Sequence, residues 1–327
     1  MNRTSYIRAA ALADVLKNLR LEDVSKNLSL ADFGVSSYLL SNPERLVPTD
    51  TFLEATSRSN YATGDTGFLF RSGFGLHLPN LGLAAQSMIF AETLRDALET
   101  LQLAVKYFQS DSGIEIQIRK GRCQVIYSNW LGENTDGNLD VQYSVGIVAN
   151  LVRQTHHSFD PEMKLFYPNA RRSHLTNTST DMDVVSSNVG IVEFDERSLW
   201  DRMTLSNPER WEIMRRFVGS NSIDDTFEYS LTDTVGRLVS ASMGISRVSR
   251  SGIAAMLGMN VRTFQRNLQA EQTTFRYILE RTMQEIAMED LSAGRSVTET
   301  ALKLGYDHPQ NFTTAFHRWF ERTPSSV

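Results

Sequence analysis

SGIAAMLGMNVRTFQRNLQ, residues 251–269, and SVTETALKLGYDHPQNFTTAFHRWFERTP, residues 296–324, are the two stretches that decide the fold. Each contains a short segment of helical apolar periodicity, a glycine and a second such segment, the pattern of two helices joined by a tight turn. Gly258 and Gly305 stand at the turns, where a positive φ is easiest for glycine. The sequence therefore predicts two helix-turn-helix units on one chain.

A long helix is predicted between the two units. Its apolar residues recur at intervals of three and four: Phe275, Ile278, Leu279, Met283, Ile286 and Leu291. A helix of about eighteen residues spans roughly 27 Å. Such a rod can hold two recognition helices about one DNA turn apart, which is on the order of 34 Å.

The second helix of the first unit has the composition of a DNA-reading helix. Asn260 is a favourable N-cap, and Phe264 and Leu268 are expected to face inward. The outward residues are then polar and able to contact bases or phosphates. They are Arg262, Gln265 and Arg266.

The second unit repeats this organisation. Ser296 and Glu299 form a capping box, and Asp307 is expected to cap the following helix, with Pro309 in its first turn. Phe312 and Phe316 are expected to face inward. The predicted DNA-contacting residues are Gln310, Asn311, Thr313 and Thr314.

The C-terminal stretch resembles the AraC/XylS family of bacterial transcription regulators. The residues that carry the match are Ala254, Leu257, Gly258, Met259, Arg262, Thr263, Gln265, Arg266, Leu268, Phe275, Ala287, Leu291, Ala301, Leu304, Gly305, Tyr306, Phe312, Ala315, Phe316, Arg318, Trp319 and Pro324. Three positions depart from the family pattern. Gln272 replaces the usual glycine, and Met283 and Thr314 replace usual arginines, so weaker DNA binding is expected of the second unit.

The chain of 327 residues is long enough for two domains. We predict an N-terminal domain over 1–220, a connecting segment over 221–243 that includes a helix from Thr226 to Met243, and an all-α DNA-binding domain over 244–327. The resemblance given below implies that the domain over 1–220 is an effector-binding and dimerisation domain. The net charge of −5 is unevenly spread, because residues from 231 onward carry eleven Lys and Arg against nine Asp and Glu. Ten of those eleven cations are arginines, which bind phosphate and guanine edges bidentately.

The N-terminal region is predicted to be α+β with an antiparallel sheet. The clearest hairpin signal is IEIQI–RKGR–CQVIY, with Gly121 in the turn, and the clearest helix starts at Thr93. Further strands are expected at FLF (68–70), Lys164–Tyr167 and Val184–Phe194, and helices over 139–155, from a cap at Thr49 or Asp50, and as two short helices within 4–30. Strands and helices do not alternate regularly, which argues against a doubly wound nucleotide fold.

Residues 25–200 resemble the effector-binding and dimerisation domain of AraC-type regulators. The match runs through LADFGVSSYLLSNPERLVPTDTF, TGDTGFLFRSG and TLRDALETL. The resemblance implies a homodimer and a small-molecule effector. Partners would be double-stranded promoter DNA and, for an activator, RNA polymerase.

Arginines are the candidate effector-binding residues, because guanidinium binds anionic groups. They are Arg71, Arg119, Arg122, Arg171 and Arg172. The whole chain resembles AraC-like activators that respond to cyclic di-GMP and switch on exopolysaccharide genes, so cyclic di-GMP is the leading effector hypothesis. A sugar, an amino acid or another small metabolite is an alternative, as is DNA binding that needs no effector.

An enzyme is not expected. The sequence has no Gly-rich phosphate loop, no G-x-S-x-G and no H-E-x-x-H, and neither a cofactor nor a metal site is predicted. Cys123, the single cysteine, excludes an internal disulfide and is expected to be a buried strand residue, with a thiol nucleophile or sensor as the alternative. With no signal peptide and no membrane span recognised, a cytoplasmic protein is expected.

Overall fold

The structure is a computed structural model that describes residues 5–21, 44–130, 137–155, 162–175, 182–220 and 230–327. Its contacts define two compact units. The first comprises Met1–Trp211 and Val218–Glu228, and the second comprises Glu212–Phe217 and Tyr229–Val327. No helix among the described residues combines the length and the hydropathy needed to cross a membrane.

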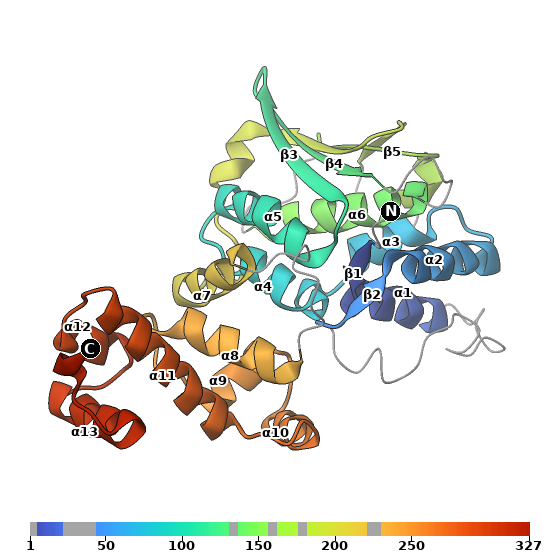
Figure 1. Ribbon diagram of the computed structural model, residues 1–327. Helices are drawn as coiled ribbons and strands as arrows, with labels where there is room; N and C mark the ends of the chain where they lie inside the picture. Colours follow the sequence, from blue (N-terminus) through green and yellow to red (C-terminus); the bar gives the residue numbers. More distant parts are fainter. Residues whose placement is uncertain (1–4, 22–43, 131–136, 156–161, 176–181, 221–229) are drawn as a thin grey trace. The chain divides into compact units, whose positions relative to one another are not determined.

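The first unit is α+β (Figure 1). Its helices are α1 (Ala9–Leu21), α2 (Thr49–Thr63), α3 (Phe68–Gly75), α4 (Leu83–Ile89), α5 (Leu94–Phe108) and α6 (Gly137–Val152), with 3-10 turns η3 (Leu78–Leu81), η4 (Arg172–Leu175) and η5 (Glu196–Trp200). Helix α7 (Pro208–Gly219) is divided, because its residues Glu212–Phe217 belong to the second unit. Its strands are β1 (Tyr6–Arg8), β2 (Leu46–Pro48), β3 (Ser112–Arg119), β4 (Arg122–Asn129), β5 (Lys164–Tyr167), β6 (Asp183–Ser186) and β7 (Gly190–Asp195).

The main sheet has the strand order β3-β4-β7-β5-β6. Its pairs are antiparallel except for β5 with β6, which is parallel. Helices α5 and α6 pack against the sheet, α5 on β3 and α6 on β4, β5 and β7 (Figure 1). Alternation along β4 turns Cys123, Val125 and Tyr127 into the core beneath these helices.

Local signals placed two elements of this unit correctly. The β3–β4 hairpin turns at Lys120 and Gly121, whose φ angles are +51° and +78°, as a two-residue type I′ loop requires. Helix α5 begins at Thr93, whose hydroxyl accepts from the Asp96 amide while the Asp96 carboxylate accepts from the Thr93 amide. Both predictions are confirmed.

The strand expected at residues 68–70 is wrong, because these residues open helix α3. The reason is a close crossing of α3 and α6. A Cβ on Gly73 would lie 2.3 Å from the Tyr143 carbonyl oxygen, and one on Gly146 would lie 2.4 Å from that of Phe70. Gly73 therefore allows the backbones of α3 and α6 to touch, while Gly64 and Gly67 end α2 and precede α3 and do not form turns around a strand.

Two smaller expectations are also corrected, and a third is tested only in part. Pro48 is the N-cap of α2 and gives it no side-chain cap, whereas the Thr49 hydroxyl donates to Ser5 Oγ at 3.0 Å. The segment 184–194 is two strands, β6 and β7, with a turn at Ser187 whose hydroxyl accepts from the Val189 amide. Within 4–30, α1 is the only helix in the described residues, and the second one expected lies outside them.

The second unit is all-α among its described residues. It contains α8 (Leu231–Ser242), α9 (Arg250–Met256), α10 (Val261–Ala270), α11 (Phe275–Ser292), α12 (Val297–Lys303), α13 (Pro309–Phe320) and the 3-10 turn η6 (Pro324–Ser326). Helix α8 packs on α11 and begins after Ser230, whose capping box with Asp233 stops the helix from starting earlier. The helix expected from Thr226 thus corresponds to α8, while residues 221–229 lie outside the description.

Candidate DNA-binding face and effector site

Helix α10 presents the polar face expected of a recognition helix. Phe264 and Leu268 are buried, and Phe264 meets Phe275 edge-to-face at 6.1 Å. The Asn260 side chain accepts from the Thr263 amide at 2.8 Å, so the predicted cap is confirmed. Because Phe264 and Leu268 face the core, the opposite face of α10 is exposed. That face carries Arg262, Gln265 and Arg266.

Helix α13 presents a less basic face. Phe312 and Phe316 are buried, while Gln310, Asn311 and Thr314 are exposed and Thr313 is half-buried. The Thr313 hydroxyl donates to the Pro309 carbonyl at 3.1 Å and the Thr314 hydroxyl to that of Gln310 at 3.0 Å. Because their protons are used within the helix, the threonines offer a partner methyl groups and acceptor lone pairs.

The cap expected from Asp307 is corrected. The N-cap of α13 is His308, with φ −131° and ψ 128°, and it makes no side-chain capping bond. Pro309 sits in the first turn as expected, and a residue that precedes proline is driven into this extended conformation. Proline therefore fixes where the helix starts.

Helix α11, eighteen residues long, joins the two helix-turn-helix units. Two contacts hold the second helix-turn-helix, α12 and α13, on α11. Glu280 accepts from Arg318 and from the Trp319 indole, both at 2.8 Å, and the buried Asp290 pairs with Lys303 at 2.9 Å. The pKa of Glu280 is lowered, first by the bond from Trp319 and then by the charge of Arg318. Helices α12 and α13 are thus each held on α11 by an ion pair.

Sequence reasoning missed two arginines beside the first recognition helix. Arg250 and Arg276 line a hollow of about 280 Å³ together with Gln265 and Gln269. Both arginines lie in the first turn of their helices, α9 and α11, where a cation opposes the helix dipole. An arginine in the first turn of a helix is a sequence pattern that could have indicated these residues. There its charge and the free backbone amides can bind the same phosphate.

Acidic residues are absent from the first turns of α9, α10, α11 and α13. By contrast, α8 and α12 carry Asp233 and Glu299 there. An N-terminus without a carboxylate leaves its amide groups available to an anion. In the described part of the second unit, the N-termini of α9, α10, α11 and α13 therefore carry no carboxylate that would repel a phosphate.

The candidate effector arginines fall into two places. Arg71 lies on α3, paired with Asp65, and His174 from η4 lies against the same turn. A Cβ on Gly67 would come within 2.8 Å of both Arg71 Nη1 and His174 Cγ. The structure therefore brings two segments about a hundred residues apart in sequence into contact here.

His174 links this place to a second candidate arginine. Its imidazole is buried, with Nε2 2.9 Å from the Thr66 hydroxyl and Nδ1 3.2 Å from that of Tyr167. Desolvation lowers the pKa of His174, and the charges of Arg71 and Arg171 lower it further. Arg171 and Arg172 are exposed at the start of η4.

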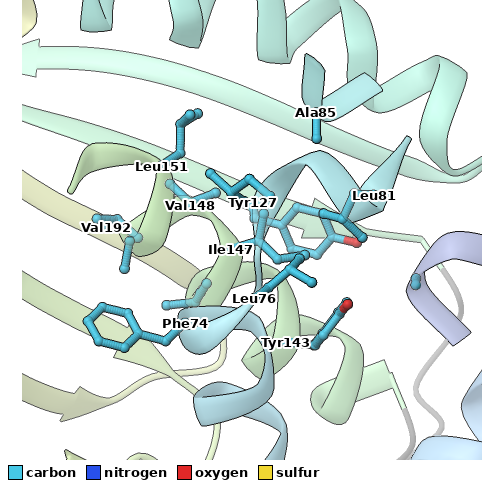
Figure 2. Close-up of a cluster of buried hydrophobic side chains, with 14 of the residues drawn as sticks. Phe74, Leu76, Leu81, Ala85, Tyr127, Tyr143, Ile147, Val148, Leu151 and Val192 are labelled. Atoms are coloured by element: carbon cyan, nitrogen blue, oxygen red, sulfur yellow. The ribbon is translucent and has the colours of Figure 1, made fainter. Parts of the chain in front are cut away.

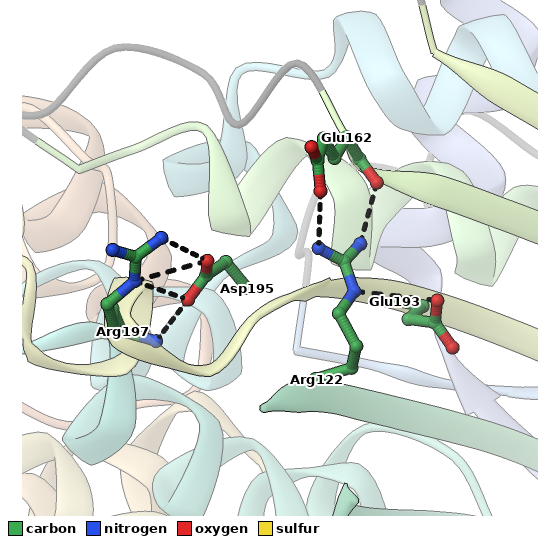
Figure 3. A network of polar contacts seen from close by, with 5 residues as sticks. All are labelled: Arg122, Glu162, Glu193, Asp195 and Arg197. Atoms are coloured by element: carbon green, nitrogen blue, oxygen red, sulfur yellow. Dashed lines mark hydrogen bonds and ion pairs between the residues drawn. The ribbon is translucent and has the colours of Figure 1, made fainter. Parts of the chain in front are cut away.

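Arg119 and Arg122 lie instead at the β3–β4 hairpin, opposite each other in register. Arg119 is exposed. Arg122 donates to the Glu162 carbonyl at 2.6 Å and forms ion pairs with the carboxylates of Glu162 and Glu193, both at 3.5 Å (Figure 3). Its guanidinium is held by two carboxylates from neighbouring segments, which gives it a structural role in the sheet.

Cys123 is buried in β4, as predicted. Burial, assisted by the nearby charge of Glu196, raises the pKa of its thiol to about 12. A thiol that stays protonated is neither a nucleophile nor a metal ligand. In the parts of the chain that the structure describes, no group of His, Cys, Asp and Glu could hold a metal ion.

Two family models match this chain. Residues 253–327 match the model described as "Helix-turn-helix domain", and residues 26–175 match "Arabinose-binding domain of AraC transcription regulator, N-term". The second description is that of AraC transcription regulators, a family that is not enzymatic.

Curated relatives match over a short stretch. Uncharacterized HTH-type transcriptional regulators of Mycobacterium bovis and Mycobacterium tuberculosis are each 35% identical over 74 residues, which is 22% of this chain and 22% of theirs. Among solved structures, the transcriptional regulator CdpR from Pseudomonas aeruginosa aligns with a TM-score of 0.43 and 16% identity over 97% of both chains. A DNA-binding transcriptional dual regulator from Escherichia coli K-12 aligns with a TM-score of 0.29 and 19% identity, over 31% of this chain and 90% of that one.

Proposed function

We propose that this chain is a sequence-specific activator of transcription whose DNA binding is controlled by a small molecule. The matched helix-turn-helix model and the matched N-terminal model of AraC transcription regulators support this proposal. The observation that carries this proposal is the exposed face of α10, where Arg262, Gln265 and Arg266 stand opposite a buried aromatic anchor. Residues 244–327 would bind promoter DNA and residues 1–220 would bind the effector, joined by residues 221–243.

Fluorescence anisotropy on a site selected from random DNA tests the DNA-binding role. Arg262→Ala or Arg266→Ala should reduce discrimination between the selected site and scrambled DNA by about 1–3 kcal/mol. Arg281→Ala is the matched control, because that exposed arginine is paired with Glu285 on α11. Equal weakening on every DNA sequence would make the α10 arginines phosphate contacts. Unchanged binding of both variants would contradict the proposal.

We propose cyclic di-GMP as the effector, bound by Arg71 with Arg171 and Arg172. Support comes from the two chain segments that meet at His174. A Cβ on Gly67 would touch both Arg71 and His174, and the His174 amide donates to the Arg171 carbonyl at 2.9 Å. Calorimetry of the full chain with cyclic di-GMP should give a binding isotherm that Arg71→Ala and Arg172→Ala weaken and Arg58→Ala, an exposed arginine on α2, does not. No heat at high protein concentration would end the cyclic di-GMP proposal. Binding that is unchanged in both Arg71→Ala and Arg172→Ala would contradict the assigned site. Arg119 and Arg122 would then be the next arginines to substitute.

A sugar, an amino acid or another small metabolite is the alternative effector. A second alternative is that the protein binds DNA without any effector. Footprinting on the selected site with and without each compound separates these cases. A cytoplasmic homodimer that contacts RNA polymerase completes the proposal. Sedimentation of the full chain that gives a monomer at the concentration of DNA binding would contradict the dimer.

A further inference from the structure

A small apolar cavity lies within the first unit, between the helices α4, α5 and α6 and the β3–β4 hairpin. Its free volume is about 50 Å³, room for about three or four water molecules or one short ligand. Figure 2 shows Ala85 from α4, Tyr127 from β4, and Ile147 and Val148 from α6 clustered at this place. A nucleotide is far too large for this volume, so the cavity is distinct from the arginine site proposed above.

The lining is apolar except at one end, where Gln109, Tyr127 and Ser144 meet. These three come from the end of α5, from β4 and from α6. Tyr127 is fully engaged there. Its hydroxyl donates to Asp140 Oδ2 at 2.7 Å. Burial, with the neighbouring Asp140, raises the pKa of this hydroxyl well above its ordinary value.

Asp140, 1% exposed, stands behind this polar end. Its Oδ2 accepts from Tyr127 and from Asn129 Nδ2 at 2.8 Å, while its Oδ1 has no hydrogen-bond partner among the described residues. Burial raises the pKa of this carboxyl, and the bonds from Tyr127 and Asn129 oppose the rise. A second anion placed nearby would be repelled and would lose its hydration.

Among the polar residues that line the cavity in the described structure, Gln109 has hydrogen-bonding capacity left over. It is 2% exposed, and its carboxamide makes only long contacts, 3.4 Å from Nε2 to Asp140 and 3.5 Å from Oε1 to the Tyr127 hydroxyl. Ordinary hydrogen bonds of these types are about 2.7–3.2 Å long. A buried amide with weak partners at the wall of an apolar cavity is unfavourable unless a guest completes its bonds.

We propose that this cavity binds a short, neutral, amphipathic molecule of the aliphatic alcohol class. The hydroxyl both donates to and accepts from the Gln109 carboxamide, and the hydrocarbon chain lies among the apolar side chains. The proposal names a ligand class for the alternative given above, in which another small metabolite and not cyclic di-GMP is the effector, and its regulatory meaning rests on that part of the proposed function. Binding is measured without DNA, so its failure and the failure of the DNA-binding proposal are separate results.

The test follows alanine methyl resonances of the full chain during titration with 1-butanol, butanoate and butylammonium. These probes share a four-carbon chain and differ in the head group. We expect 1-butanol to shift the methyls of Ala84, Ala85 and Ala104 saturably, and each charged probe to bind at least about tenfold more weakly. The absence of a saturable shift with 1-butanol, or equal binding of either charged probe, would overturn the proposal.

Two substitutions locate the guest. Gln109→Leu should weaken 1-butanol binding by about tenfold, whereas Gln102→Leu, an exposed glutamine on the same helix, should leave it unchanged. Ala104→Leu should fill the cavity and abolish the shifts of Ala84 and Ala85. If Ala104→Leu does not fold, the two glutamine variants decide alone. Equal effects of Gln109→Leu and Gln102→Leu would refute the assigned site.

Discussion

Gln272 lies just beyond α10 with a φ of +57°, a left-handed conformation that costs a non-glycine residue about 1–2 kcal/mol. The hydrogen bonds around it are those of a helix end of the glycine type, since the Thr273 amide donates to the Leu268 carbonyl at 3.0 Å. At the ends of α9 and α12 the corresponding positions are Gly258 and Gly305. The backbone at residue 272 therefore favours the glycine that the family resemblance led us to expect. With Gln272 in its place, the backbone is strained at the C-terminal end of α10.

Gln272→Gly should raise the free energy of unfolding of the second unit by about 0.5–1 kcal/mol. The relief of strain exceeds the extra entropy that glycine gives the unfolded chain. Urea denaturation followed by circular dichroism measures this. Gln269→Gly, inside α10, is the matched control and should lower stability by about 1 kcal/mol. A loss of stability in both variants would contradict the strain argument.

Asp14 on α1 makes the stability of the first unit dependent on pH. Burial raises the pKa of this carboxyl from 3.8 to about 6, although the Tyr143 hydroxyl at 3.2 Å opposes the shift. Because the folded-state pKa is the higher one, the folded protein binds the proton more tightly. The resulting stability is fully present below about pH 4 and is lost as the pH rises through about 6.

Asp14→Asn should remove this dependence. At pH 7 the variant should be more stable than the parent by up to about 3 kcal/mol, and the difference should vanish below about pH 4. Thermal unfolding between pH 4 and pH 8 measures the difference. Asp183→Asn, exposed on β6, should show no such trend. A constant difference at every pH would mean that the carboxyl acts through packing and not through its proton.

The crossing of α3 and α6 fixes the architecture of the first unit at the scale of elements. Gly146→Ala would place a Cβ 2.4 Å from the Phe70 carbonyl oxygen and 2.9 Å from the Phe74 amide nitrogen, backbone atoms that cannot move aside alone. We expect a loss of about 3 kcal/mol or more, measured by urea denaturation. Gly75→Ala, at the end of α3 with no atom within 4 Å of the new Cβ, should be neutral or slightly stabilising.

Whether an element could be predicted depended on where its cause lies in the sequence. The hairpin at Gly121 and the helix after Thr93 have local causes, a turn conformation and a capping box, and both were predicted. Helix α3 has a distant cause, because Gly73 packs against α6 near Gly146, which lies some seventy residues later in the sequence. A short apolar run has no period of its own, so the sequence favoured a strand there.

The candidate sites divide in the same way across the whole molecule. The outer face of α10 follows from the spacing of Phe264 and Leu268, and the sequence predicted it. The meeting of Arg71 and Arg171 at His174, and the cavity at Gln109, each join segments that only the folded chain brings together. Such sites leave no periodic signal, and candidate residues can be proposed for them only by type.

The two helix-turn-helix units are unequal. Two exposed arginines stand on α10, whereas the corresponding part of α13 has threonines whose hydroxyls donate to its own backbone, and its Arg318 is paired with Glu280. If both helices contact DNA as proposed, the first helix-turn-helix unit supplies most of the positive charge. Binding by one chain should then be weak, and in the proposed homodimer the pairing of two chains would be the variable that the effector controls.

Thr314→Arg tests this inequality, since the family resemblance places an arginine at that exposed position. The variant should bind the selected DNA site about tenfold more tightly, and its affinity should fall more steeply with salt by about one phosphate contact. Leu302→Arg, which adds the same charge at an exposed position of α12, is the control. Anisotropy titrations from low to moderate salt measure both. If Leu302→Arg raises the affinity equally, general attraction explains the gain, and α13 does not face the groove at position 314.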